Sequence, residues 1–244
     1  MACIIVAVGA FALYMSPLLP IKEVKVNGAE HVSTTEVAQA AAVPEGSTML
    51  RVDTKAIEER LEKDGWIADA KVIRSLPSTL TLKITERSIA AVVTISSTEN
   101  QQDEDWAIGA DGVWICKLPS QDSDEAADIP ASVYEQADGA MKITDVPYGV
   151  APVAGSKATD ASVTNALDII SGMTTDLADS VVSISATDGK NATIMLDSGI
   201  EIAFGEAKDI RTKERVCLEL MNEYPDQIAY INVRVADRPT WRSI

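Results

Sequence analysis

Histidine, cysteine and aromatic residues are scarce in this chain. Its 244 residues include one histidine, three cysteines and two phenylalanines, and all aromatic residues together make up 5%. So few cysteines exclude a disulfide framework, and none of the spacings matches a zinc site. Cys116 and Cys217 would pair only if the fold brought them within bonding distance. The cores must therefore be built from Val, Ile, Leu and Ala, which a hydrophobic content of 46% supplies.

Catalytic signatures are missing as well. No Gly-rich phosphate loop follows a predicted strand, and the sequence contains no nucleophile elbow. The single histidine, His31, precedes a predicted helix, where we expect a surface or capping role. Carboxylates are plentiful, but their clusters fall in polar loops and on helix faces, without apolar neighbours to raise a pKa. We therefore expect no enzyme, no catalytic residue, no metal ion and no cofactor.

Positive charge is in short supply. The chain has 21 Lys and Arg residues against 37 Asp and Glu residues, a formal net charge of −16. A surface with this balance repels phosphates, so we expect the soluble part to bind neither nucleic acid nor anionic headgroups by charge. The acidic stretch 119–130 does not have calcium-loop spacing, and we predict that it is a mobile excursion.

The one long apolar run lies at the N-terminus. No charged residue occurs before Lys22, and a run of about 20 residues can cross a bilayer. We predict a membrane-spanning helix over residues 1–20; a cleaved signal peptide and a buried core helix remain alternatives. No basic residue precedes the run, which predicts that a cytoplasmic tail is missing from this version of the chain. Everything after the span should lie outside the cytoplasm.

Residues 21–87 follow the order strand, helix, helix, strand, strand, which predicts a compact α+β unit. A capping box at Ser33 and Glu36 opens the first helix, and Asp53 caps the second. The last two strands form a hairpin, because apolar and polar residues alternate along each run and a proline lies in the turn between them. The predicted inward positions of the hairpin are Ala68, Ala70, Val72, Leu80, Leu82 and Ile84.

Residues 88–236 read as a second, mostly antiparallel β domain with two helices. Asp111 and Gly112 mark a hairpin turn, and two more turns predict a meander between residues 181 and 204. The other predicted segments are strands at 90–95, 141–146 and 229–235, a polar loop at 96–105, helices at 161–173 and 209–221, and a polar tail at 237–244. For the second helix, capped by Asp209, the predicted buried face is Ile210, Cys217, Leu220 and Met221.

The hairpin at residues 66–87 carries a family resemblance. It is similar to the end of the POTRA (polypeptide-transport-associated) domain of the FtsQ/DivIB cell-division family. That family usually has a proline two residues after the Glu-Arg pair, where this chain has Ile89. The motif residues are Trp66, Arg74, Pro77, Glu86 and Arg87, with further matches at Ile67, Ala70, Val72, Leu80 and Ile84.

The resemblance implies a single-pass membrane protein whose POTRA domain, β domain and tail span 21–87, 88–236 and 237–244. It implies a non-enzymatic scaffold at the division septum, mainly extracytoplasmic, that links early and late division proteins. Its expected partners are FtsB/DivIC-type and FtsL-type proteins and the septal wall synthase complex, through which it would help regulate septal peptidoglycan synthesis. The alternative is an extracytoplasmic cell-wall enzyme with unrecognised catalytic groups, which a wall-hydrolysis assay would detect.

The partner site is predicted at the last strand. Because residues 230–235 end the predicted domain, we expect an exposed sheet edge with unpaired N–H and C=O groups. A partner strand can complete such an edge, and the resemblance implies that the FtsB-type partner docks there. An interior strand that serves only the core is the alternative. The predicted partner-binding residues are Tyr230, Asn232, Arg234 and Trp241.

Overall fold

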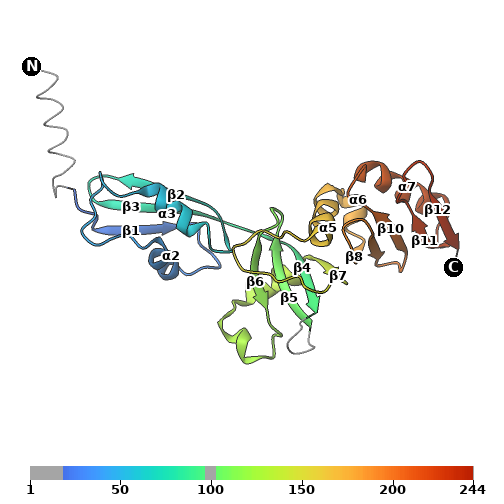
Figure 1. Ribbon diagram of the computed structural model, residues 1–244, viewed down its shortest axis with the longest axis horizontal. Helices are drawn as coiled ribbons and strands as arrows, with labels where there is room; N and C mark the ends of the chain where they lie inside the picture. Colours follow the sequence, from blue (N-terminus) through green and yellow to red (C-terminus); the bar gives the residue numbers. More distant parts are fainter. Residues whose placement is uncertain (1–18, 97–102, 244) are drawn as a thin grey trace, which may run out of the picture. The chain divides into compact units, whose positions relative to one another are not determined.

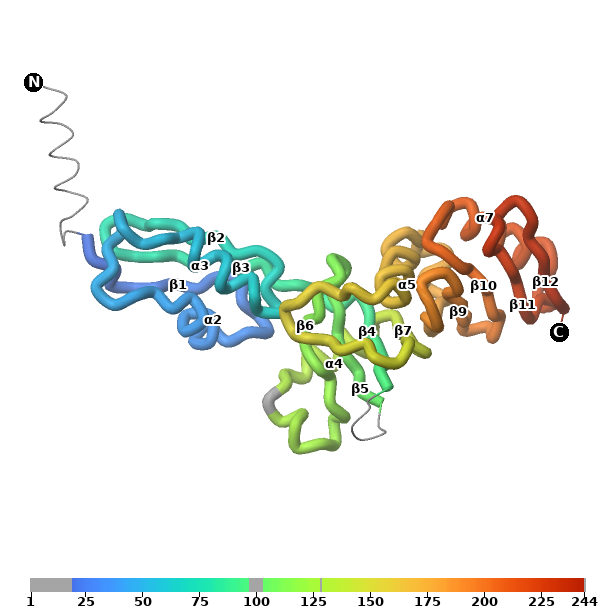
Figure 2. Tube along the Cα trace, viewed as in Figure 1, coloured from blue at the N-terminus to red at the C-terminus, as the bar shows by residue number. Residues whose placement is uncertain are grey.

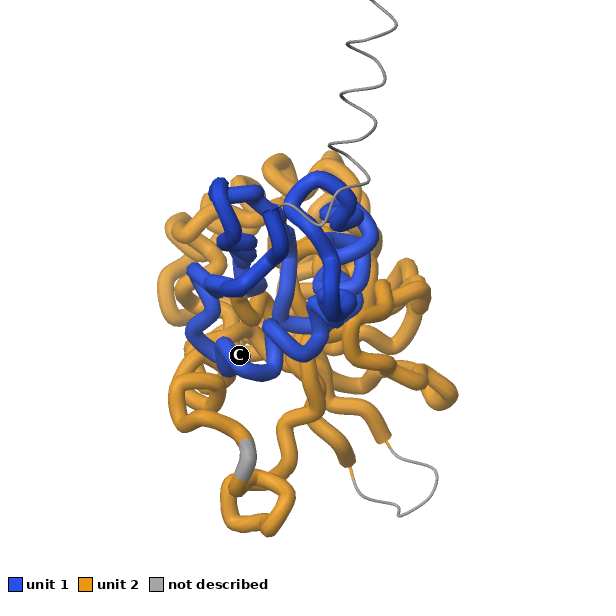
Figure 3. The backbone as a smooth tube through the Cα atoms, turned by 90° about the vertical axis from the view of Figure 1, so that its left-hand side faces the viewer, with its two compact units in different colours: residues 1–87 blue, residues 88–244 orange. Residues whose placement is uncertain are grey.

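The computed structural model describes residues 19–96 and 103–243 and forms two compact units that divide between Arg87 and Ser88 (Figure 3). The predicted anchor over residues 1–20 lies, except for its last two positions, outside the described residues. Within the described part of the chain, no helix is long and apolar enough to span a bilayer.

Residues 19–87 have the predicted order of strand, helix, helix, strand, strand (Figure 1). The three strands lie in the order β1-β3-β2, with β1 parallel and β2 antiparallel to the central β3. The elements are β1 (Glu23–Asn27), α2 (Thr34–Ala41), α3 (Thr54–Leu61), β2 (Ile67–Ser75) and β3 (Thr79–Glu86).

Capping and alternation build this unit as the sequence predicts. The Ser33 hydroxyl accepts the Glu36 amide at 3.1 Å, and the Glu36 carboxylate accepts the Ser33 amide at 3.0 Å. Asp53 accepts the Ala56 amide at 3.1 Å and so caps α3. One strand position was wrong: Ala68 is exposed, because an irregular register at the start of β2 turns Ile67 inward instead. The buried core contains Val37, Ala41, Ile57, Leu61, Ile67, Ala70, Val72, Leu80, Leu82 and Ile84.

The second unit contains one nine-stranded mixed sheet with helices packed against it. Figure 2 traces the course of the chain through this unit. The strand order is β12-β11-β10-β9-β8-β7-β4-β5-β6, and the three pairings β4–β7, β7–β8 and β10–β11 are parallel. The strands are β4 (Ile89–Ser96), β5 (Asp103–Gly109), β6 (Trp114–Leu118), β7 (Met141–Thr144), β8 (Val181–Ala186), β9 (Ala192–Leu196), β10 (Glu201–Gly205), β11 (Ile228–Asn232) and β12 (Thr240–Ser243).

The helices of this unit include two that the sequence analysis missed. The predicted helices correspond to α5 (Ala161–Gly172) and α7 (Ile210–Glu223), whereas α4 (Ala131–Asp138) and α6 (Thr175–Ala178) were not predicted. A short 3₁₀ helix, η1 (Asp124–Asp128), lies in the acidic stretch that was predicted to be mobile. Both α4 and α6 are a few turns or less, so hydrophobic periodicity has little length over which to appear.

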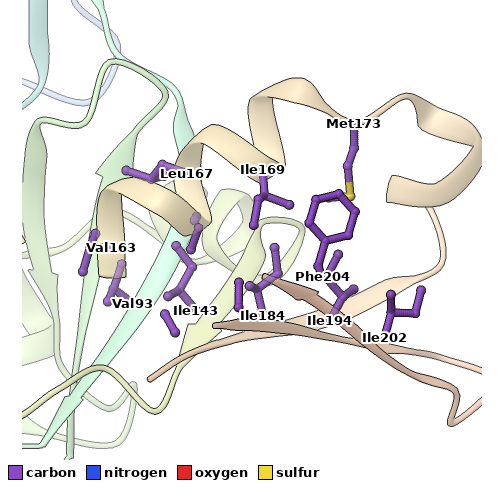
Figure 4. Close-up of a cluster of buried hydrophobic side chains, with 14 of the residues drawn as sticks. Val93, Ile143, Val163, Leu167, Ile169, Met173, Ile184, Ile194, Ile202 and Phe204 are labelled. Carbon is purple, nitrogen blue, oxygen red and sulfur yellow. The ribbon is translucent and has the colours of Figure 1, made fainter. Parts of the chain in front are cut away.

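A continuous core lies between the sheet and α5. In Figure 4, Val163, Leu167 and Ile169 of α5 lie over the sheet residues Val93 and Ile143. The same core continues to β9 and β10, where Phe204 is fully buried. This core holds the strands that lead towards β11 and β12 in a fixed register.

Several boundaries in the second unit differ from the sequence-based prediction. The predicted loop 96–105 ends early, because β5 begins at Asp103 and pairs with β4. The predicted strand at 141–146 stops at Thr144, and Asp145 adopts a positive φ of 54°. The predicted polar tail contains the strand β12.

Cys217 is a free thiol, so the disulfide with Cys116 that the sequence left open is not formed. It lies buried on α7, and burial raises its pKa to about 12. A thiol held protonated in this way packs as a small apolar side chain rather than as a nucleophile.

Candidate partner-binding edge

One of the two edge strands of the large sheet is β12, and its neighbour β11 is an interior strand. β11 pairs in parallel with β10 on one side and antiparallel with β12 on the other. The prediction that residues 230–235 form the sheet edge was therefore wrong. Within the described residues no strand pairs with the far side of β12. The open edge of the sheet therefore lies at β12, which contains Trp241.

The alternation of backbone groups along the strands shows which N–H and C=O groups of β12 point away from β11. The Val233 amide donates to the Ala203 carbonyl of β10 at 3.0 Å. Since backbone groups alternate along a strand, Tyr230 and Asn232 direct theirs towards β12, opposite Arg242 and Thr240. The N–H and C=O groups of Trp241 and Ser243 therefore point outward, where another strand would bind.

The side chains of this edge are anchored on both faces of the sheet. The Trp241 ring lies 4.6 Å from the Tyr224 ring, centroid to centroid, and packs against the core beneath α7. On the opposite face, the Arg242 guanidinium lies 4.2 Å from the centroid of the Tyr230 ring. Such cation–π contacts stabilise exposed sites by roughly 0.5–1 kcal/mol. A four-residue strand is thus held in place by an aromatic contact on each side.

Asn232 and Arg234 shape the connection between β11 and β12. The Asn232 side chain accepts the Arg234 amide at 3.2 Å, an Asx turn that ends the strand. Arg234 packs so closely on Gly205 that a Cβ there would lie 3.0 Å from its Cγ. Gly205 also has a φ of 80°, which a side chain disfavours. Val235 is 59% exposed, whereas Val233 is buried.

Arg234 also lines a groove of about 540 Å³ at the carboxyl ends of β10 and β11. The groove mixes charges of both signs, with Lys190 and Lys208 opposite Asp237. Lys208 forms an ion pair with Glu206, which lowers the pKa of Glu206 and raises that of Lys208. The groove therefore has no strong preference for one sign of charge.

Buried polar residues that the sequence analysis missed hold the helix behind the edge. Lys213 on α7 is 3% exposed and donates to the carbonyls of Phe204 and Glu206 at 2.9 and 2.7 Å. Burial lowers its pKa. Glu214, equally buried, accepts the Thr174 amide at 2.8 Å. Both lie three or four residues from buried Cys217, a spacing that could have marked them as inward-facing.

Asn165 adds a further link behind the edge. It donates to the Gly205 carbonyl at 3.0 Å and accepts the Ala207 amide at 2.7 Å, which ties α5 to the loop after β10. The Asp209 side chain forms no cap hydrogen bond with α7, contrary to the prediction; that residue instead adopts a φ of 52°. Asp209 instead contributes to the helix start through its backbone carbonyl, which accepts the amides of Thr212 and Lys213 at 2.9 and 3.0 Å.

The predicted motif residues of the first unit hold its loops rather than form a site. Glu86 accepts the amides of residues 30–32 at 2.9 to 3.1 Å and the His31 Nδ1 proton at 2.7 Å. Trp66 stacks on the His31 ring with centroids 4.6 Å apart. Arg87 donates to the carbonyls of Gly65 and Ile67 at 2.9 and 2.6 Å.

The other two motif residues act in the same way. Arg74 donates to the Val52 carbonyl at 2.7 Å, and Pro77 lies in the turn between β2 and β3. All five motif residues belong to the first unit, whereas β12 belongs to the second.

Two family models match the chain. One, described as POTRA domain, FtsQ-type, matches residues 19–87, and the other, described as Cell division protein FtsQ/DivIB, C-terminal, matches residues 143–234. The chain therefore resembles FtsQ/DivIB proteins in both of its units. The FtsQ/DivIB C-terminal match includes Tyr230, Asn232 and Arg234 and ends before Trp241.

Curated relatives named cell division protein FtsQ match along most of the chain. The protein of Mycobacteroides abscessus is 29% identical over 88% of this chain and 59% of its own length. The protein of Mycolicibacterium smegmatis is 30% identical over 83% of this chain and 51% of its own length. The protein of Streptomyces collinus is 27% identical over 88% of this chain and 75% of its own length. The chain thus spans about half to three fifths of the first two FtsQ relatives.

Proposed function

We propose that the protein is a non-enzymatic scaffold of the cell-division machinery that binds an FtsB/DivIC-type partner by strand addition at β12. The observation that supports this most directly is the open edge itself. Its outward N–H and C=O groups belong to Trp241 and Ser243, and β12 carries no proline to block pairing. An edge left open in this way invites another chain unless it is used.

The partner-binding residues divide into two roles under this proposal. The main chain of β12 provides the hydrogen bonds, and Trp241 and Arg242 provide the side chains that a partner strand meets. Tyr230, Asn232 and Arg234 act indirectly, because they position β12 and its connecting loop. Aromatic and arginine residues are also the commonest contributors to binding energy at protein interfaces.

The wider role follows from the family and stays part of the proposal. The chain is anchored by residues 1–20 with residues 21–244 outside the cytoplasm, and it is enriched at the septum. Together with FtsB/DivIC-type and FtsL-type partners it links early and late division proteins to the septal wall synthase complex and helps regulate peptidoglycan synthesis. The relatives that support this are named for cell division.

A matched pair of variants at Ser243 tests strand addition. Ser243→Pro removes an outward N–H while leaving the pairing of Arg242 with Tyr230 in place, and an edge position tolerates proline. Ser243→Ala keeps the N–H and removes only the hydroxyl. We expect the proline variant to lose co-purification with the FtsB/DivIC-type protein of the same organism, and the alanine variant to retain it.

Two controls make the result decisive. Circular dichroism and hydrogen exchange at β10 and β11 should show that Ser243→Pro stays folded. If the folded proline variant captures the partner as well as Ser243→Ala does, docking at β12 is wrong. Asn232→Pro serves as the disruptive reference, because its N–H faces β12 and its loss should release that strand.

A further inference from the structure

The exposed apolar side chains of the first unit gather at one end. Among residues 19–87, the large hydrophobic side chains that lie exposed are Leu50, Ile73 and Leu76, at 38%, 41% and 68%. Leu76 lies in the turn between β2 and β3, and Ile73 lies three residues before it. Leu50 lies in the loop between α2 and α3. We name these three residues the apolar tip.

Hydrogen bonds connect both loops of the apolar tip to the start of the described chain. The amide of Lys22 donates to the Ser78 carbonyl at 2.9 Å, beside Leu76. On the other side, the amide of Met49 donates to the Leu19 carbonyl at 2.9 Å, beside Leu50. The two loops that carry Leu50 and Leu76 therefore lie beside Leu19 and Lys22, where the described chain begins.

The strand directions place the same loops at this end. β1 and β3 are parallel, and Glu23 lies opposite Thr79 in their register (Figure 1). The turn that precedes β3 is thus level with the beginning of β1. A control position lies at the opposite end of the unit. It is Lys63, an exposed residue between the end of α3 and the start of β2, and β2 begins opposite the last residue of β3.

We propose that the apolar tip inserts into the interfacial layer of the bilayer in which the N-terminal segment is anchored. This inference rests on the anchoring in the proposed function. Single exposed apolar residues are common on soluble proteins, but among the described residues of the first unit the large ones lie at the end that an anchor would hold at the membrane surface. Leucine side chains at that depth leave water for the acyl boundary, and a nearby lysine can keep its ammonium among the headgroups.

Charge does not oppose this contact. Residues 19–87 carry ten Lys and Arg residues against eleven Asp and Glu residues, so the acidic excess of the chain lies after residue 87. Near the apolar tip, the exposed cations Lys22, Arg51 and Arg74 are balanced by the exposed carboxylates of Glu23, Glu45 and Asp53. Insertion should therefore depend on apolar burial and only weakly on the charge of the lipid.

The test uses the full chain in vesicles whose lipids are brominated near the headgroup end of the acyl chains. Tryptophan is introduced by Leu76→Trp, Leu50→Trp or, as the control, Lys63→Trp, and the emission of the parent chain is subtracted. We expect bromine to quench most of the added emission of the two tip variants and little of that of Lys63→Trp. Equal quenching of Leu76→Trp and Lys63→Trp would overturn the proposal. It would favour a protein, rather than the bilayer, as the surface that the apolar tip contacts.

Flotation of the same vesicles separates this inference from the anchoring on which it rests. A chain that floats with vesicles but shows no tip quenching overturns membrane contact of the tip alone. A chain that does not float overturns the anchor and the tip contact together.

A second measurement avoids introduced tryptophan, because tryptophan itself favours membrane interfaces. Hydrogen exchange of residues 75–78 is compared between the parent chain and the double variant Leu50→Asp/Leu76→Asp in the same vesicles. We expect faster exchange in the double variant, and equal exchange would contradict insertion.

Discussion

The outer edge of β2 in the small sheet and the outer edge of β12 in the large sheet are protected to very different extents. At β2, the Val72 amide that points away from β3 donates to the Glu58 carboxylate of α3 at 2.8 Å. A few residues further on, Arg74 extends from β2 to the Val52 carbonyl. At β12, no such bond to an outward group of Trp241 or Ser243 occurs within the described part of the chain.

This difference indicates which edge is available to a partner. A carboxylate that already accepts an edge amide must be displaced before another strand can pair, and a hydrogen bond to a charged group is worth about 1.5–3 kcal/mol. The edge at β12 carries no such cost. The opposite edge of the large sheet is partly covered, because Trp114 of β6 exchanges backbone hydrogen bonds with Gly155 and Ser156. Of these three edges, β12 is the least protected.

The largest effect is expected from a variant that destabilises the three-stranded sheet, whose β2 edge is protected by Glu58. Leu82 is fully buried in β3, and Leu82→Ala should cost about 2–5 kcal/mol of unfolding free energy. Its neighbour Thr81 faces away from the core, and Thr81→Ala should cost under about 0.5 kcal/mol. Hydrogen exchange of β3 amides measures both. Equal protection in the two variants would mean that the strand faces are assigned wrongly.

A smaller effect, dependent on pH, is expected at Glu86, which is 8% exposed. Burial raises its pKa, but hydrogen bonds from His31 and from the amides of Val32 and Glu30 outweigh burial, so the folded-state pKa lies below the ordinary value. The stability that Glu86 contributes should therefore be complete above its unfolded pKa of about 4.3 and be lost as the pH falls through the folded value.

Glu86→Gln isolates this contribution. The variant should lose about 1.5–3 kcal/mol at neutral pH, because a neutral amide replaces a charged acceptor of several amides. Denaturation of the parent and the variant across a series of pH values should give curves that converge on the acid side. Curves that stay parallel down to acid pH would show that the carboxylate charge does not matter. The hydrogen bonds that Glu86 accepts do not involve the outward amides of β2, so the self-association of the chain should not change.

The smallest effect on stability tests the closed edge directly. Glu58→Ala frees the Val72 amide and should cost about 1–2 kcal/mol, since the residue is only partly buried. It should also increase self-association, because β2 then resembles β12. Sedimentation velocity measures the association, and Glu59→Ala, which removes only an exposed pair with Lys55, is the matched control. If the two variants sediment alike, Glu58 does not protect the edge.

Local patterns in the sequence were sufficient for most of the first unit. The capping box at Ser33, the Asp53 cap and the alternation of Leu80, Leu82 and Ile84 each depend on residues a few positions apart. Such signals are visible without knowledge of the fold. Ala68 was misassigned because an irregular register shifts the alternation by one residue, and a strand's own sequence does not mark where its partner slips.

The candidate site depended on contacts that no local pattern reveals. The sequence by itself determined that a strand follows α7, and the apolar residues Ile231 and Val233 of that predicted strand are buried. Only the tertiary structure decided which strand is the edge. Residues 240–243 are mostly polar, and they form β12 because the backbone of Tyr230 and Asn232 offers them partners and Tyr224, on another element, packs against Trp241. Pairing and ring packing between residues distant in sequence thus fixed the open edge, whereas the sequence of the segment itself predicted a tail.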